Sequence, residues 1–202
     1  SAGVSDYTTK VTRYNNPSKL LSKYYVGQTL GELWGFSVGG FFVSDEEAAN
    51  YPVDQSYLNQ QIITSVGERG LRAGDVKYLD LDGDNEISIG SNTVDNPGDQ
   101  RIIGNTLPRY AYNFKLGASW NGVDFSAFFQ GIGHQDWYPA GNAISFWGPY
   151  SRPYCSFIPT QFMDEVWTET NTGAYFPRAR GYEALQTNYS LGSPNDRYLQ
   201  NI

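Results

Sequence analysis

The sequence predicts a mainly β chain of antiparallel strands and long loops, with only a few short helices. Aromatic residues make up 16% of the 202 residues, and Gly occupies 22 positions. This composition favours strands and turns, because aromatic side chains fit a pleated sheet and Gly accepts the backbone angles of tight turns. In addition, apolar residues alternate with other residues on both sides of the Asn121–Gly122 pair, which is typical of a β-hairpin.

The composition of the chain also argues against several classes of function. The formal net charge of −7 argues against a nucleic-acid partner, whose phosphates require Lys and Arg. The single Cys, Cys155, permits no intramolecular disulfide, and with the single His, His134, it supplies too few ligands for zinc. His134 lies in the Gly-flanked stretch GIGHQDW and is interpreted as a loop or strand-end residue. Without an acid–base motif, no enzyme is expected.

The N-terminal part of the chain is expected to be polar and turn-rich at residues 1–25 and extended over residues 24–42, where Gly separates aromatic residues. Ser44 opens a capping box, in which its side chain caps a helix and Glu47 reaches back to a free backbone N–H. A short helix is therefore expected here, and it should end by Pro52 because Pro removes a helical hydrogen bond.

Further short elements are expected around the hairpin. Residues 55–66 are a second helical candidate, and residues 76–88 are interpreted as a short strand that runs into an acidic turn. Thr160 is the candidate cap of a short helix over residues 161–167. No internal repeat or domain boundary is evident. Loops or irregular structure are expected over residues 67–75, 91–100, 133–159 and 168–202.

The hairpin has two chemically different faces. An Asn-Gly pair accepts positive φ at both central positions of a type I′ turn, so Trp120 should pair with Val123 across the ladder. Paired side chains share one face of the sheet. The apolar face then holds Tyr112, Phe114, Leu116, Ala118, Trp120, Val123, Phe125, Ala127 and Phe129, and the polar face holds Asn113, Lys115, Ser119, Asp124, Ser126 and Gln130, interrupted by Phe128.

Two interpretations of this hairpin, at about residues 109–132, remain open at this point. Each strand can run for about 11 residues, which is the length that a tilted strand needs to cross a bilayer. Tyr110 and Tyr112 at one end and Trp120 at the other fit the aromatic girdles of a membrane barrel. However, a hairpin in a soluble antiparallel sheet alternates in the same way.

The stretch DLDGDNEIS carries the ligand spacing of a calcium loop. Asp80, Asp82 and Asp84 occupy positions 1, 3 and 5, where carboxylates surround one hard cation. Glu86 would offer its backbone carbonyl at position 7, and Ser88 would act at position 9 directly or through water. Ca²⁺ is accordingly the one cofactor that the sequence suggests, and a solvated turn without metal is the alternative.

This loop departs from the calcium pattern at two positions. Asn85 occupies position 6 of the loop, where Gly is usual. This departure is small, because Asn tolerates the left-handed backbone conformation that the position requires. Ser91 stands where the closing Glu belongs, so another carboxylate must close the site. Asp99 and Asp95 are the candidates.

Together with the hairpin and the acidic loop, further blocks of sequence make the chain resemble SusC/RagA-type TonB-linked outer-membrane transporters of Bacteroidetes. The resemblance rests on YYVGQTLGELWGFSVGGFFVSDEEA, GDVKYLDLDGDNEIS and the stretch from DNPGDQRIIGN through the hairpin. It continues through FMDEVWTETNTGAYFPRA and NDRYLQN, and so covers roughly residues 17–202. The order and spacing of these blocks are more specific than any single block.

The resemblance implies a segment, residues 1–202, of the C-terminal half of a 22-stranded transmembrane β-barrel. Both ends of the chain are expected to be cut from a longer protein. Such transporters import glycans or peptides across the outer membrane with energy from the TonB system, and a SusD-like surface lipoprotein caps them. The resemblance also favours Asp99, in Asp-Gln-Arg, as the distant ligand of the acidic loop.

Two functions from different classes are therefore kept. The first is part of a TonB-dependent transporter that imports glycans or other oligomeric nutrients. The second is a soluble extracellular module that binds carbohydrate or mediates adhesion with Ca²⁺. Four aromatic side chains in the loop after the hairpin are candidates for stacking on sugars, although packing inside the loops is the favoured interpretation; they are Trp137, Tyr138, Trp147 and Tyr150.

Overall fold

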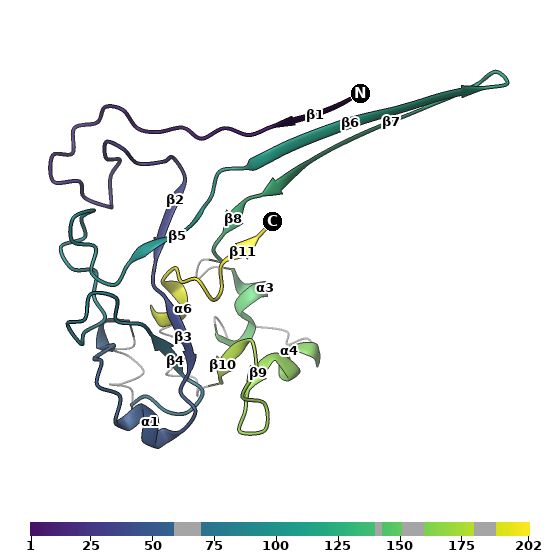
Figure 1. Cartoon of the computed structure of the whole chain (residues 1–202). Coiled ribbons are helices and arrows are strands. Elements are labelled where there is room, and N and C mark those ends of the chain that lie inside the picture. The colour runs from purple at the N-terminus through teal and green to yellow at the C-terminus, as the bar shows by residue number, and fades with distance from the viewer. Residues whose placement is uncertain (59–69, 140–142, 151–159, 180–188) are drawn as a thin grey trace.

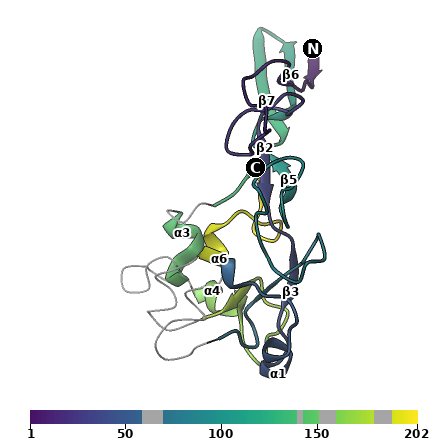
Figure 2. The same ribbon diagram turned by 90° about the vertical axis from the view of Figure 1, so that its left-hand side faces the viewer.

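A long hairpin projects from a body of short elements in the computed structural model of the chain (Figure 1). The structure describes residues 1–58, 70–139, 143–150, 160–179 and 189–202. A view turned by 90° shows the hairpin at the top of the molecule, with the helices of the body below it (Figure 2). The chain is mainly β, with antiparallel strands and a few short helices, as the sequence predicts.

The hairpin consists of β6, Arg109–Trp120, and β7, Val123–His134. Its turn has Asn121 at φ 48° and Gly122 at φ 80°, both in the left-handed region that a type I′ turn requires. Trp120 pairs with Val123 and Phe114 with Phe129, so the predicted register is confirmed. The strands extend two residues beyond the predicted end, to His134.

A third strand joins the hairpin near its base. β1, Ala2–Ser5, runs antiparallel to β6, and it pairs Ala2 with Phe114 and Ser5 with Ala111. The sequence prediction placed these residues in a turn-rich segment and missed this strand. Four residues are too few to show an alternating pattern, and the open edge of β6 supplies the hydrogen bonds that hold them extended.

Helix α1, Asp45–Ala49, confirms the predicted capping box. The Ser44 side chain accepts a hydrogen bond from the Glu47 N–H at 3.1 Å. The Glu47 carboxylate reaches back and accepts one from the Val43 N–H at 2.6 Å. The helix ends before Pro52, also as expected. The second helical candidate, residues 55–66, lies mostly outside the described residues, and residues 56–58 are helical.

The segment predicted to be extended, residues 24–42, contains two strands. β2, Glu32–Gly35, pairs with β5, Arg101–Asn105, and β3, Val38–Phe41, pairs with β4, Val76–Tyr78. Both pairs are antiparallel. The acidic turn therefore follows a short strand, as predicted for residues 76–88, and β5 carries the chain from the acidic region to the hairpin.

The C-terminal part of the body corrects several predictions. The predicted helix over residues 161–167 starts at Thr160, which is its first residue rather than its cap, and ends at Glu165. Val166 and Trp167 are strand because both are buried against a parallel neighbour. The predicted loops also contain short elements, namely β8, Asp136–Trp137, α3, Ile144–Trp147, η1, Gly148–Tyr150, α4, Thr160–Glu165, β9, Val166–Trp167, β10, Phe176–Arg178, α6, Tyr189–Gly192, and β11, Gln200–Asn201.

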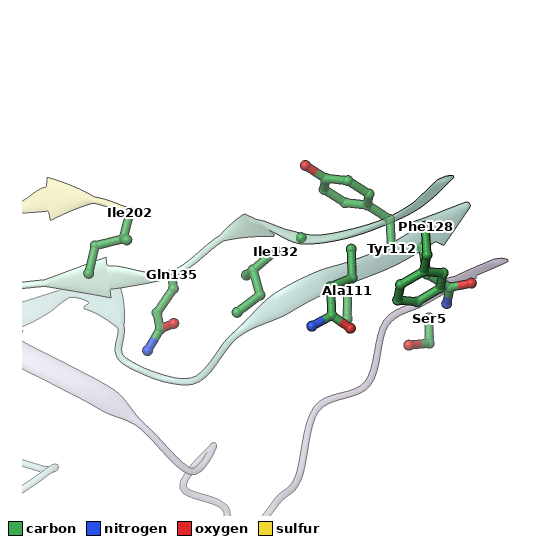
Figure 3. Close-up of a pocket in the computed structure, with 10 residues that line it drawn as sticks. Ser5, Ala111, Tyr112, Phe128, Ile132, Gln135 and Ile202 are labelled. Atoms are coloured by element: carbon green, nitrogen blue, oxygen red, sulfur yellow. The ribbon is translucent and has the colours of Figure 1, made fainter. Parts of the chain in front are cut away.

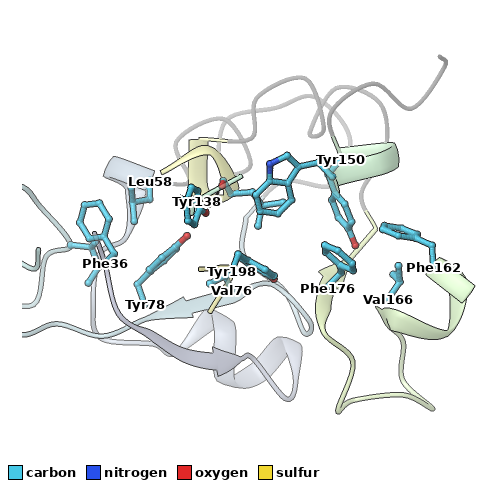
Figure 4. Packing of buried hydrophobic residues seen from close by; sticks show 13 residues of the cluster. Phe36, Leu58, Val76, Tyr78, Tyr138, Tyr150, Phe162, Val166, Phe176 and Tyr198 are labelled. Carbon is cyan, nitrogen blue, oxygen red and sulfur yellow. Dashed lines mark hydrogen bonds between the residues drawn. The ribbon is translucent and has the colours of Figure 1, made fainter. Parts of the chain in front are cut away.

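An aromatic core holds the body together (Figure 4). The rings of Phe162 and Phe176 lie 4.9 Å apart, and those of Trp147 and Tyr198 lie 5.2 Å apart with nearly perpendicular planes. Phe36, near the start of the chain, belongs to the same cluster. One core therefore joins residues from both sides of the hairpin.

Candidate functional sites

The acidic loop after β4 is shaped by its own first carboxylate. Asp80 accepts hydrogen bonds from the N–H groups of Gly83 and Asn85, at 2.6 and 2.9 Å. These bonds hold the pKa of the Asp80 carboxyl below its usual value. Asn85 has φ 64°, so it occupies the left-handed conformation expected at position 6 of a calcium loop.

Asp99 forms hydrogen bonds with both ends of this loop. It is fully buried, and its two oxygens accept hydrogen bonds from the N–H groups of Leu81 and Ser88, each at 2.7 Å. Ligand oxygens of Asp80, Asp82 and Asp99 all lie within 4.8 Å of one another. The chain thus brings a carboxylate from beyond the loop next to those of Asp80 and Asp82.

These three carboxylates fit a hard divalent cation. Partial desolvation raises the pKa of Asp82, and the charges of Asp84, Asp99 and Asp80 also raise it. A Ca²⁺ ion at the shared position would offset that repulsion, because oxygen ligands from several carboxylates are its preferred surroundings. Ca²⁺ takes six to eight oxygens, so backbone carbonyls or water would complete the shell.

Of the predicted acidic side-chain ligands and closing candidates, Asp84 and Asp95 lie outside this cluster. Asp84 accepts a hydrogen bond from the Glu86 N–H at 2.8 Å, and Ser88 Oγ accepts one from the Gly90 N–H at 3.0 Å. Glu86 itself forms a β-bridge with Asp54. Asp95, the alternative closing residue, pairs with Lys19 at 3.1 Å. Among the described residues, the acids gathered at this site are therefore Asp80, Asp82 and Asp99.

We expect calorimetric titration with Ca²⁺ to give a weak site with a dissociation constant on the order of 10⁻⁴ M. Asp82→Asn should abolish the heat of binding, because it removes one charge from the cluster. The matched control is Asp84→Asn, which changes an acid of the same loop outside the cluster and should retain binding. Equal loss in both variants would place the ligand set elsewhere, and an absence of heat in the unmodified chain would exclude the site.

Three of the four predicted sugar-stacking rings lie in the core. Tyr138, Trp147 and Tyr150 are 8%, 2% and 2% exposed, whereas Trp137 is 43% exposed. Burial raises the pKa of the Tyr138 and Tyr150 hydroxyls well above the usual value. Both hydroxyls donate to backbone carbonyls, those of Leu191 and Pro177. These three rings present no open face to a sugar, and packing inside the loops accounts for them.

The apolar face of the hairpin is open to solvent. Trp120 is 81% exposed, Phe125 60% and Leu116 55%. Phe114 and Phe129 stack on each other at 4.7 Å, yet 36% and 47% of them remain exposed. No described part of the chain packs over this stripe, which extends along the whole ladder.

Charged and polar contacts at the base of the hairpin were not predicted. Arg109 pairs with Asp6 at 2.5 Å, and His134 lies 3.1 Å from Asp136. Asp136 also accepts a hydrogen bond from the Asn105 N–H at 2.7 Å. Asp6 and Arg109 are 103 positions apart, so no local pattern could have indicated their pairing. The Arg109–Asp6 pair joins the hairpin to the segment that follows β1, and Asp136 joins β8 to β5 below the hairpin.

Each helix among the described residues is too short or too polar to span a lipid bilayer. No protein-family model matches the chain, and no curated protein matches it. The resemblance to the transporter family therefore rests on the sequence blocks quoted above.

Proposed function

We propose that this chain is a segment of a SusC/RagA-type TonB-dependent transporter of the outer membrane. The observation that carries the proposal is the exposed apolar face of the β6–β7 hairpin. A contiguous apolar stripe of this kind is rare on a soluble monomer and marks a contact with lipid or protein. In a transmembrane barrel, this face contacts lipid and the opposite, polar face lines the interior.

The dimensions of the hairpin support this assignment. Each strand has 12 residues. Such a strand is about 40 Å long, and with a tilt of about 40° it covers about 30 Å along the membrane normal. Tyr110 and Tyr112 lie near the base and Trp120 at the turn, which are the interfacial positions that Tyr and Trp prefer.

The position of the body supports an orientation. Barrels of this class have short turns at the periplasmic end and long segments outside the cell. The two-residue turn lies at one end of the hairpin and the body at the other (Figure 1). The body would accordingly lie on the extracellular side, where a SusD-like lipoprotein and a glycan or another oligomeric nutrient would meet it. Ca²⁺ at Asp80, Asp82 and Asp99 would brace the loop there.

A soluble extracellular Ca²⁺-dependent carbohydrate-binding or adhesion module is the second candidate. The clustered carboxylates of the acidic loop and the separate aromatic core of the body favour it. Such a module does not account for the exposed apolar stripe. The two candidates therefore differ in what they require at Leu116, Phe125 and Phe129.

Light scattering of the purified chain with and without detergent separates the two candidates. The transporter segment should bind detergent and should aggregate when detergent is removed, because its apolar stripe then has no apolar neighbour. Circular dichroism in both conditions confirms that the chain is folded. A folded species that binds no detergent and stays soluble in buffer, whether monomer or edge-to-edge dimer, would contradict the proposal.

A further inference from the structure

The chain between β1 and β2 differs in charge from the rest of the protein. Residues 7–30, which we call the basic segment, contain four Lys or Arg residues and no acidic residue. All other residues together contain ten Lys or Arg residues and 21 acidic residues. The net charge is therefore +4 in the basic segment and −11 in the remainder, so the segment is a positive region of an acidic chain.

Hydrogen bonds hold the basic segment in a defined shape. Its two ends lie antiparallel to each other, and the Leu30 N–H donates to the Thr9 carbonyl at 2.8 Å. The buried side chain of Asn16 closes the turn between them, because it accepts from the Leu20 N–H and donates to the Leu20 carbonyl, both at 3.0 Å. The segment therefore presents an ordered surface.

Three of the four cations on this surface have no ionic partner. Lys10, Arg13 and Lys23 are exposed, and none of them forms an ion pair with another described residue. Lys19 differs, because its ammonium group lies 3.1 Å from the Asp95 carboxylate. Cations whose charge is not offset locally attract an anionic surface.

Exposed aromatic side chains lie among these cations. The rings of Tyr14 and Tyr24 meet edge to face with their centroids 5.6 Å apart, which brings their sequence neighbours Arg13 and Lys23 into the same region. Tyr14 is 46% exposed, Tyr24 53% and Val26 55%. Lys and Arg beside exposed Tyr rings are typical of a surface that contacts anionic lipid, because both kinds of side chain have an apolar part and a polar end.

The basic segment begins where the sheet of the hairpin ends. Val4 pairs with Tyr112, so it shares the apolar face, and it is 76% exposed. Figure 3 shows the Tyr112 ring on one side of this sheet and the Ser5 side chain, at the end of β1, on the other. The chain between β1 and β2 lies near the hairpin base and away from α1 and α4 (Figures 1 and 2). In the proposed barrel, it leaves the lipid-facing sheet at the extracellular membrane surface.

We propose that the basic segment binds the phosphate groups of lipopolysaccharide in the outer leaflet around the barrel. This inference rests on the proposed transport function and names a lipid partner for its extracellular side. Lys10, Arg13 and Lys23 supply the positive charge, and the rings of Tyr14 and Tyr24 lie at the interface, where Tyr is favoured. Lipid is the partner because the segment directly continues a strand that carries the apolar face.

The test is calorimetry of the full chain in dodecyl maltoside micelles, titrated with lipid A, the phosphorylated anchor of lipopolysaccharide, in the same detergent. Lipid A should bind at least about tenfold more tightly than dephosphorylated lipid A. A variant with Lys10→Gln, Arg13→Gln and Lys23→Gln should lose affinity on the order of a hundredfold, because each cation near an anionic surface contributes roughly fivefold. Added salt should weaken binding as well, because it screens exposed charges.

The matched control carries Lys77→Gln, Arg101→Gln and Lys115→Gln, which remove the same charge outside the basic segment. This control should retain the affinity for lipid A, and circular dichroism checks that both variants are folded. The proposal is overturned if lipid A does not bind, if its dephosphorylated form binds equally well, or if both variants lose the same affinity. Tighter binding of a soluble oligoglutamate peptide would also overturn it and would assign the surface to an acidic protein.

The detergent experiment on the unmodified chain judges the transporter assignment separately. A chain that is soluble without detergent, yet binds phosphatidylcholine vesicles containing lipid A through Lys10, Arg13 and Lys23, would refute the transporter and retain the lipid surface. A chain that requires detergent but does not distinguish the two forms of lipid A would retain the transporter and refute the lipid surface.

Discussion

On the proposed transporter assignment, Leu116→Lys should strongly reduce assembly of the complete protein into the outer membrane. Leu116 pairs with Ala127 near the middle of the ladder, and it is 55% exposed on the apolar face. A Lys at the bilayer midplane of a barrel costs about 2–4 kcal/mol, and the cost falls towards the interfaces. Phe125→Lys, nearer the turn, should therefore have a smaller effect. The measurement is the folded, protease-resistant fraction of the protein in isolated outer membranes.

Ser126→Lys is the matched control for this experiment. Ser126 is the neighbour of Ala127 on β7 and lies at nearly the same depth, but its side chain belongs to the polar face. This variant should assemble normally, because in the proposed barrel the added charge faces the interior. Equal assembly of Leu116→Lys and Ser126→Lys would show that the apolar stripe does not contact lipid.

Trp147→Ala should destabilise the body by about 3–5 kcal/mol, the usual effect of truncating a buried aromatic side chain. Trp147 is 2% exposed, and its ring lies 4.8 Å from that of Phe146 and 5.2 Å from that of Tyr198. Its indole N–H also donates to the Pro139 carbonyl at 2.8 Å. Urea unfolding followed by near-ultraviolet circular dichroism measures the loss.

Two further variants separate packing from hydrogen bonding at this position. Trp147→Phe keeps a ring but removes the N–H donor, so its loss of stability should be intermediate. Trp137→Ala removes an indole that is 43% exposed and should change stability much less. If Trp147→Ala and Trp137→Ala had the same effect, the aromatic cluster would not be the core that stabilises the body.

Local patterns predicted the elements whose hydrogen bonds are local. The register of β6 and β7 follows from Asn121 and Gly122, because a two-residue turn specifies which residues pair. The start of α1 follows from Ser44 and Glu47, which bond within the same turn of chain. No comparable signal existed for β1, since its hydrogen-bonding partner lies more than a hundred positions away.

The acidic loop was predictable in part. The spacing of Asp80 and Asp82 indicated a cation site, and the family resemblance favoured Asp99 as the distant ligand. Asp84 was assigned to the same set, but the acids whose ligand oxygens lie within 4.8 Å of one another among the described residues are Asp80, Asp82 and Asp99. Sequence spacing alone does not tell which carboxylates of a turn converge on a shared position.

The aromatic loop after the hairpin was the least predictable region. Tyr138, Trp147 and Tyr150 lie in a stretch rich in Gly and Pro, which is typical of an exposed loop. The rings of Trp147 and Tyr150 pack against Phe176 or Tyr198, which follow much later in the chain. The Tyr138 hydroxyl bonds to the equally distant Leu191 and Asn195. Only the tertiary contacts distinguish an aromatic ring that packs in the core from one that is exposed and able to bind a sugar.

The sequence by itself determined the hairpin, with its turn, register and two faces, because strand alternation and turn chemistry act between near neighbours. It also determined the helix cap and two of the clustered carboxylates. Asp99 was one of two candidates for a further carboxylate. Only the tertiary structure decided that it, rather than Asp95, joins Asp80 and Asp82, that three aromatic rings are core, and that the apolar face stays open. Each of these three outcomes depends on which segments, distant in sequence, come into contact. The free energy of such contacts is distributed over many residues, and no short sequence pattern contains all of them.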